Sequence, residues 1–111
     1  MRKMSKYIFS VNISPAEAMN IVKKNHNADL VHEEKIDLGD RKAVCILVYE
    51  KYYLRAENRA ALTVIIDNSS GQTKVRSIAA GSSKGLLFGF DWGAGDDFAY
   101  SIKSMLEKYT I

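Results

Sequence analysis

The spacing of hydrophobic positions changes near the start of the chain. Apolar side chains recur at every second position over Tyr7–Ile13, which predicts a strand with one strongly apolar face. The stretch Ser14–Glu17 then has the form of a capping box with proline at the first helical position. The expected buried stripe of this helix consists of Ala18, Ile21 and Val22. The pattern predicts a short helix that ends near residues 25–27.

Four more strands are predicted in the middle of the chain, each bounded by residues that favour turns. The expected strands are Leu30–Leu38, Ala43–Leu54, Ala60–Asp67 and Thr73–Ala80. The first of them is the weakest, because charged residues interrupt its apolar pattern. Turns are predicted around Gly39-Asp40, Glu57-Asn58 and residues 68–71.

A second helix is predicted at the end of the chain. Its apolar stripe has helical spacing and consists of Phe98, Ile102, Met105, Leu106 and Tyr109. Asp96 and Asp97 are expected at the start of this helix, where its dipole favours anions. The resulting order is strand, helix, four strands, helix.

This order predicts an α+β fold in a single domain, residues 1–111. Consecutive strands joined by short turns form an antiparallel sheet, and two helices can cover one face of it. We expect the sheet to be curved. In element order the chain resembles one repeat of the TATA-box-binding protein, although no sequence motif is shared.

The strands are too apolar for a sheet with only one covered face. We expect the helix-covered face to hold Phe9, Val11, Leu62, Val64, Ile66 and Val75. The opposite face is expected to hold Ile8, Cys45, Leu47, Tyr49, Tyr53, Thr63 and Ile65. Because exposed apolar patches on soluble proteins mark interaction sites, something should cover this second face. The candidates are a second copy of the chain, the folded-back segment 86–90 and an apolar ligand.

Composition and charge are those of an ordinary globular domain. The 111 residues are 47% hydrophobic and 26% charged, with a net charge of +3 and interspersed signs. Cys45 is the only cysteine, so no internal disulfide is expected, and it is expected to be a buried apolar group. No apolar stretch suggests a leader or a membrane span. We therefore expect a cytoplasmic protein without a membrane partner.

The glycine-rich segment Gly81–Phe98 is the most unusual part of the sequence. It contains five of the seven glycines, the only tryptophan and three of the four phenylalanines. Such a segment is either a demanding structural joint or the wall of a site. A phosphate-binding loop is not favoured, because Asp96 and Asp97 would repel an anion and no Gly-Lys-Ser/Thr follows.

The candidates for metal binding and catalysis are weak, and we expect neither a cofactor nor an enzyme. The only cluster of possible metal ligands is His26, Asp29, His32, Glu33 and Glu34, whose spacing matches no familiar site. Asp91, Asp96 and Asp97 could form a paired-carboxylate site beside Trp92, but aspartates are common at helix starts. Cys45 lies inside a predicted strand, and no nucleophile elbow is present.

The leading hypothesis is a non-enzymatic interaction module that forms a homo-oligomer through the second sheet face. One alternative is a small apolar or aromatic ligand bound between that face and the loop 81–92. Its expected contacts are Tyr49, Tyr53, Ile65, Phe88 and Trp92. The sequence leaves the ligand and the number of copies open.

A second alternative is binding of single-stranded nucleic acid by cations interleaved with aromatic residues. The expected contacts are Lys51, Arg55, Lys74 and Arg76. Glu50 and Glu57 dilute this positive charge, and the net charge is modest, so nucleic acid is the less favoured partner.

The glycine-rich segment also carries a family resemblance. Gly-Ser-Ser-Lys-Gly-Leu-Leu-Phe-Gly-Phe-Asp-Trp-Gly-Ala-Gly-Asp-Asp-Phe, which runs on into the final helix, resembles an uncharacterised family of small bacterial proteins, mostly from Firmicutes. That family is a domain of unknown function. The resemblance implies a bacterial, cytosolic origin and assigns no site residues.

Overall fold

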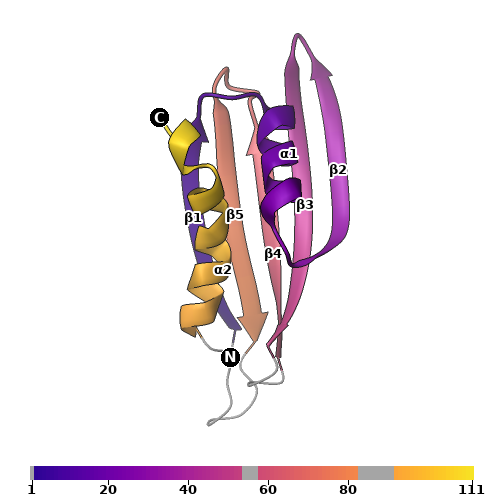
Figure 1. Ribbon diagram of the computed structural model, residues 1–111. Helices are drawn as coiled ribbons and strands as arrows, with labels where there is room; N and C mark the ends of the chain where they lie inside the picture. The colour runs from indigo at the N-terminus through magenta and orange to yellow at the C-terminus, as the bar shows by residue number, and fades with distance from the viewer. Residues whose placement is uncertain (1, 54–57, 83–91) are drawn as a thin grey trace.

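Five antiparallel strands form one open sheet. The computed structural model describes residues 2–53, 58–82 and 92–111, and of residues 2, 3, 53, 58, 82 and 92–95 the backbone alone. The strands are β1 (Arg2–Val11), β2 (Asp29–Gly39), β3 (Lys42–Tyr53), β4 (Asn58–Asp67) and β5 (Thr73–Ser82). Their order across the sheet is β1-β5-β4-β3-β2, so β4 is the central strand. The first strand, β1, therefore lies beside the last strand, β5, and forms one edge of the sheet. Strand β2 forms the opposite edge (Figure 1).

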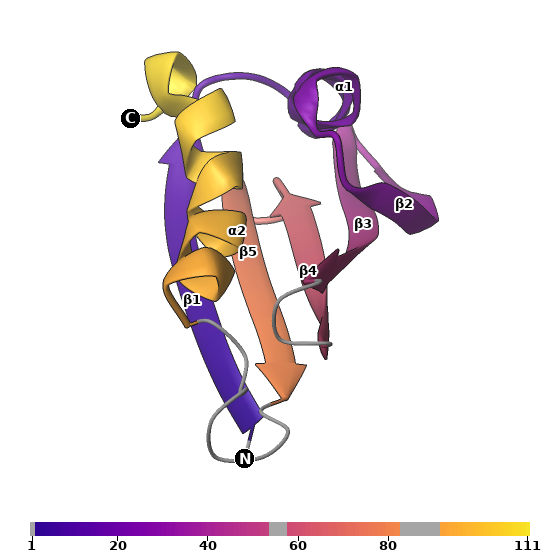
Figure 2. The same cartoon turned by 60° about the horizontal axis from the view of Figure 1, so that its bottom comes forward.

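Two helices lie on the same face of this sheet. They are α1 (Pro15–Asn25) and α2 (Trp92–Met105), and a short 3-10 turn, η2 (Glu107–Tyr109), follows α2. Helix α2 lies over β1 and β5, whereas α1 lies over β3 and β4 (Figures 1 and 2). The predicted α+β fold and element order are therefore confirmed.

The start of α1 shows why the chain becomes helical there. The Glu17 backbone N–H donates to the Ser14 hydroxyl, and the Ser14 N–H donates to the Glu17 carboxylate, both at 3.2 Å. These bonds satisfy two donors that a helix start leaves without partners. Pro15 occupies the first turn, and Ala18, Met19 and Val22 are buried against the sheet.

The turn between β2 and β3 forms at the predicted position. Gly39, Asp40 and Arg41 have φ values of 81°, 53° and 64°. Glycine adopts this left-handed region without steric cost, and aspartate tolerates it better than most residues. The Gly39 N–H also donates to the Asp37 carboxylate at 2.8 Å.

Helix α2 begins earlier than the sequence pattern predicts. It starts at Trp92, so Asp96 and Asp97 lie in its second turn, and its first turn has no acidic residue. The prediction that these two aspartates lie at the start of the helix was therefore wrong. The apolar stripe that begins at Phe98 gave no signal for the extra turn, because Gly93 and Gly95 are poor helix formers.

The hydrophobic core fills the space between the helices and the sheet. The prediction of which β3 residues face away from the helices was wrong. Cys45, Leu47 and Tyr49 are buried in this core, not on the opposite face. They pair across β3 and β4 with Ile66, Val64 and Leu62, which are buried there too. In the first half of β3 the side chains of both faces are apolar. The sequence periodicity therefore could not show which face is turned toward the helices.

The molecule is elongated, measuring 50 × 24 × 23 Å, because the β2–β3 hairpin is long. No described helix covers β2, which lies at the edge of the sheet (Figure 2). All eleven of its residues are exposed.

Candidate functional site

The sheet face opposite the helices, called the open face below, is apolar in its middle. Cross-strand pairing places Ile8, Arg76, Ile65, Ile46 and Glu34 in one row that crosses all five strands. The neighbouring rows add the apolar side chains of Met4, Val44, Val48, Ala61, Ile78 and Ala80. The open face therefore has a continuous aliphatic centre.

This centre is not covered by any described part of the chain. Ile8 is 51% exposed and Met4 is 57% exposed. Ile8, Thr63 and Ile65 lie on this face as the sequence predicts. On β3, Val44, Ile46 and Val48 take the places expected for Cys45, Leu47 and Tyr49. The sheet thus has two apolar sides although its helices cover only one.

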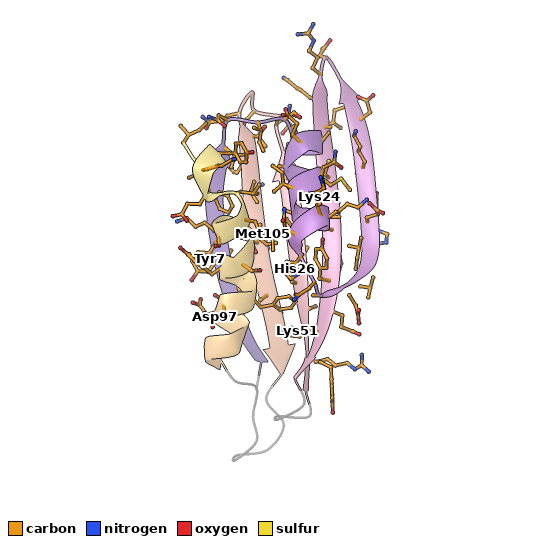
Figure 3. The ribbon with its side chains drawn as sticks, viewed as in Figure 1. Tyr7, Lys24, His26, Lys51, Asp97 and Met105 are labelled. Carbon is orange, nitrogen blue, oxygen red and sulfur yellow. The ribbon has the colours of Figure 1, made fainter. Side chains whose placement is uncertain are left out.

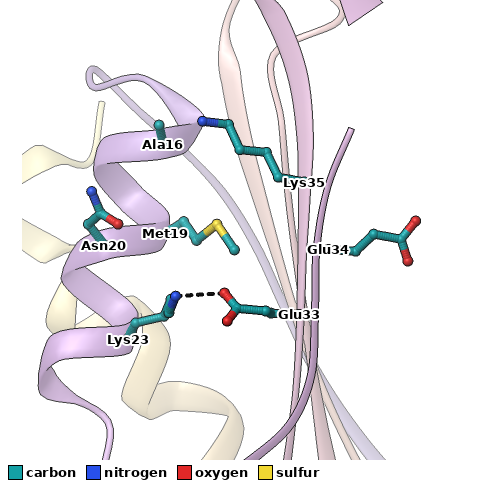
Figure 4. A pocket seen from close by; sticks show the side chains of 7 residues that line it. All are labelled: Ala16, Met19, Asn20, Lys23, Glu33, Glu34 and Lys35. Carbon is teal, nitrogen blue, oxygen red and sulfur yellow. Dashed lines mark hydrogen bonds and ion pairs between the residues drawn. The ribbon is translucent and has the colours of Figure 1, made fainter. Parts of the chain in front are cut away.

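The described open-face side chains of β1 and β5 include cations and no carboxylate, whereas β2 and β3 carry carboxylates and the cation Lys42. The cations on β1 and β5 are Lys6, Lys74 and Arg76. The carboxylates on β2 and β3 are Asp29, Glu34 and Glu50. Figure 4 shows the Glu34 side chain on the opposite side of β2 from Glu33 and α1.

One ion pair and one histidine–carboxylate contact lie within this pattern. Glu50 accepts a hydrogen bond from Arg59 at 2.7 Å, and the Arg59 guanidinium lies 5.5 Å from the centre of the Tyr52 ring. His32 lies 3.1 Å from the Glu34 carboxylate. On β4, the Ser69 backbone N–H holds the pKa of Asp67 below its usual value, with smaller help from the cations of β5. The β1–β5 side of the face is therefore basic, whereas on the β2–β3 side Lys42 and Arg59 offset part of the charge of the three carboxylates.

The structure separates the residues predicted to bind nucleic acid. Lys74 and Arg76 lie on the open face, but Lys51 lies on the helix side, 5.9 Å from the centre of the Phe98 ring. Arg55 lies outside the described residues. Because Lys51 is on the other face, these cations do not form the single basic surface that was expected.

The residues predicted to line a ligand pocket are separated as well. Tyr49 is buried on the helix side, whereas Ile65 lies on the open face. Two side chains on opposite faces of a sheet cannot line one pocket. Phe88 and the side chains of Tyr53 and Trp92 lie outside the described residues.

A small depression lies between the two helices near His26 (Figure 3). Its volume is about 250 Å³, and its lining includes Lys51, Asp97 and Met105. The His26 ring stacks on the buried Tyr49 ring with their centroids 4.6 Å apart. This site combines a titratable ring with charged neighbours, so it is the candidate for a catalytic site.

The hydrogen bonds of His26 argue against a catalytic base. Its Nδ1 accepts from the Ala28 backbone N–H at 3.2 Å, which places the proton of the neutral ring on Nε2. Nε2 then donates to the Ser101 hydroxyl at 3.0 Å, and Ser101 donates to the Phe98 carbonyl at 2.6 Å. A base that activates a serine needs a free lone pair toward that hydroxyl. Here both partners of His26 are structural.

Burial lowers the pKa of His26, and the nearby Lys51 ammonium lowers this pKa further. A protonated ring would also turn its Nδ1–H toward the Ala28 N–H, which is itself a donor. His26 is therefore held as a neutral imidazole. The sequence had offered His26 only as a candidate metal ligand.

A groove of about 390 Å³ lies between α1 and β2. Lys23 and Glu33 form an ion pair across it at 2.6 Å, and Lys35 projects toward Ala16 (Figure 4). Met19 supplies the apolar floor. Because Lys23 and Glu33 offset each other, Lys35 is the main remaining charge in the groove, and one exposed lysine does not define a ligand site.

The expected cluster of metal ligands does not converge. Glu33 faces α1, and Glu34 points to the other side of β2. His26 stacks on Tyr49 in the core, whereas His32 is exposed on β2 and contacts Glu34. Within the described ranges, no three histidine, cysteine or acidic side chains lie close enough to hold a metal ion.

Asp96 joins α2 to β1, a contact that the sequence did not indicate. Its carboxylate accepts hydrogen bonds from Ser5 at 2.5 Å and from Tyr7 at 2.9 Å. These bonds, the one from Ser5 first, lower the pKa of Asp96, and the hydrogen bond to Asp96 raises the pKa of Tyr7. Tyr7 also contacts Tyr100 edge to face. Asp97 instead lines the depression near His26, and Asp91 lies outside the described residues.

Cys45 is a free thiol in the core, and burial raises its pKa. A buried thiol with a raised pKa is a poor nucleophile. Neither helix of the described chain is long and apolar enough to cross a membrane.

Comparison with known proteins gives one match. The family of unknown function DUF6054 matches residues 4–110. No curated protein and no solved structure matches the chain, so the likeness to a TATA-box-binding-protein repeat is one of element order alone.

Proposed function

The chain belongs to DUF6054, a family of unknown function, and we propose that it is a non-enzymatic interaction module that binds a second copy of itself through the open face. The observation that carries this proposal is the aliphatic centre of that face, where side chains such as Ile46 and Ile65 stand on a sheet side without helices. An antiparallel sheet with a solvent-facing side is expected to be polar there.

The size of the open face suits a stable dimer. Strands about 4.8 Å apart that rise about 3.3 Å per residue give five strands of about ten residues a face of roughly 800 Å². A standard protein interface takes about 800 Å² from each partner. Removal of this apolar centre from water supplies the driving force for association.

The remaining sites support binding in preference to catalysis. The His26–Ser101 pair has the wrong proton arrangement for nucleophile activation, and the Cys45 thiol is buried. The proposal includes a cytoplasmic location, because a single buried cysteine forms no internal disulfide.

Analytical ultracentrifugation over a range of concentrations tests the proposal. The wild type should dimerise, and Ile46→Lys should raise the dissociation constant at least about tenfold, since it places a charge in the apolar interface. The matched control is Tyr100→Lys, because Tyr100 is 41% exposed on α2, which lies on the other face of the sheet. This control should leave the dissociation constant unchanged.

Near-ultraviolet circular dichroism establishes that both variants are folded. A wild type that stays monomeric up to high micromolar concentration contradicts the proposal. A folded Ile46→Lys variant that dimerises as well as the wild type contradicts it too.

A further inference from the structure

The distribution of charge on the open face is self-complementary, and it selects one way of pairing two copies. We propose that the two copies stack face to face about a two-fold axis that runs parallel to the strands and passes over β4. The basic edge of each copy then covers the acidic edge of the other. This inference rests on the proposed function, because it specifies how the same face binds its partner.

The first argument is the separation of charge across the sheet. On β1 and β5, Lys6 and Arg76 flank the aliphatic centre, and the described side chains of these strands place no carboxylate on the open face. On β2, Asp29 and Glu34 flank the other side. A face with cations along one edge and an excess of carboxylates toward the other complements its own reversed image.

The direction of the axis decides which edges meet. Rotation by a half turn about an axis parallel to the strands reverses the strand order of the second copy, so its β2 lies over β1 of the first. Rotation about an axis across the strands keeps the order and places β1 over β1. The second arrangement stacks Lys6 and Arg76 on cations of the same kind, and like charges in an interface are unfavourable.

The register of the sheet strengthens this choice. Arg76 and Glu34 belong to the same cross-strand row, and rotation about an axis parallel to the strands brings each row onto its own copy. When the row of one copy is laid over the same row of the other in reverse order, Glu34 of one copy lies over Ile8 of the other. In that second copy Arg76 is the cross-strand neighbour of Ile8, so Glu34 and Arg76 are offset by about one strand spacing, 4.8 Å, across the sheet. An arginine side chain spans that separation.

The central position of β4 fixes what lies on the axis. Two strands flank β4 on each side, so the reversed sheet places β4 over β4. Ile65 of one copy then faces Ile65 of the other at the middle of the aliphatic centre. Ile8, two strands from β4, lies four strand spacings, or about 19 Å, from its own copy.

Charge reversal tests the direction of the axis. Arg76→Glu and Glu34→Arg should each raise the dimer dissociation constant about tenfold, because each changes two symmetric contacts. The double variant should return the dissociation constant to within about threefold of the wild type, because it exchanges the two signs. Lys24→Glu on the exposed side of α1 is the charge control and should have no effect (Figure 3).

Cysteine cross-linking tests the position of the axis. The single native cysteine is buried, so it gives little background with a short bis-maleimide reagent. Ile65→Cys should cross-link to a covalent dimer, whereas Ile8→Cys should not, because of its distance from its own copy.

The outcomes separate the two proposals. A wild type that never dimerises overturns both of them. A dimer that tightens with Arg76→Glu, or that cross-links through Ile8→Cys and not through Ile65→Cys, leaves self-association in place and overturns the axis along β4. A double variant as weak as its single parents also overturns this axis.

Discussion

Tyr49 has a buried hydroxyl group without a partner. Its side chain is 2% exposed, and its hydroxyl is the one buried side-chain polar atom in the described parts of the chain that makes no hydrogen bond. Burial is the main cause that raises its pKa, and the Glu33 carboxylate adds to it. The ring itself packs well, since it stacks on His26. Burial of the unpaired hydroxyl therefore lowers the stability of the fold, and the packing of the ring offsets this loss.

We expect Tyr49→Phe to raise the free energy of unfolding by about 1 kcal/mol, because it removes a buried donor that has lost its water. Urea unfolding measures this change. Tyr7→Phe is the matched control, and it should lower the free energy because the Tyr7 hydroxyl donates to Asp96. A clear loss of stability in Tyr49→Phe would show that the hydroxyl has a partner.

The titration of His26 predicts how stability changes with pH. Its pKa in the folded protein is below the value of about 6.5 that holds in the unfolded chain. As the pH falls below that value, the unfolded state takes up a proton that the folded state resists, so stability falls. Urea unfolding at several values between pH 7 and 5.5 should show this loss in the wild type and much less of it in His26→Gln.

Two features make this pH test specific. His32→Gln is the matched control, because it removes the other histidine of the chain and leaves His26 and its contacts in place. The range also lies above the reference pKa values of aspartate and glutamate, about 3.9 and 4.3. Equal slopes in the wild type and His26→Gln would show that His26 has the same pKa in both states.

Helix α2 is held by more than its apolar stripe. Phe98, Ile102 and Leu106 are buried against the sheet, and the Asp96 carboxylate fastens the second turn to Ser5 and Tyr7 of β1. The buried Ser77 hydroxyl also donates to the Ala99 carbonyl at 2.8 Å. The helix is therefore fixed to the sheet by polar as well as apolar contacts.

We expect Asp96→Ala to destabilise the protein and Asp97→Ala to have a smaller effect, because Asp96 alone of the two binds β1. The pKa of Asp96 is lowered in the folded state, so its contribution is fully present above about pH 3.9. It is lost as the pH falls through the folded pKa. Urea unfolding of both variants at pH 7 measures the difference, and equal losses would contradict it.

Most of the helices, strands and turns could be predicted from the sequence. Capping residues defined the start of α1, and turn residues defined the β2–β3 hairpin, because these signals act within a few residues. The start of α2 was missed, since its first turn contains two glycines and no apolar stripe. The faces of β3 were missed because both of its alternating sets are apolar and its pairing with β4 sets the side.

The molecule as a whole has an asymmetric open face. Its helices cover four strands on one side only, and on the other side the cations of β1 and β5 lie across the sheet from the carboxylates of β2 and β3. Sequence order does not show this separation, because β1 joins the sheet beside β5. The strand order places Lys6 on the strand that pairs with the one holding Lys74 and Arg76, about seventy residues away in the chain. The proposed dimer depends on this placement.

By itself, the sequence determined the element order, the two covering helices and the excess of apolar strand positions, because these depend on local periodicity and on turn chemistry. Tertiary structure alone decided which side of β3 faces the core, which cations share a face and where Asp96 binds. Each of these depends on pairing between distant segments, and a shift of one residue in that pairing moves a side chain to the other face of the sheet.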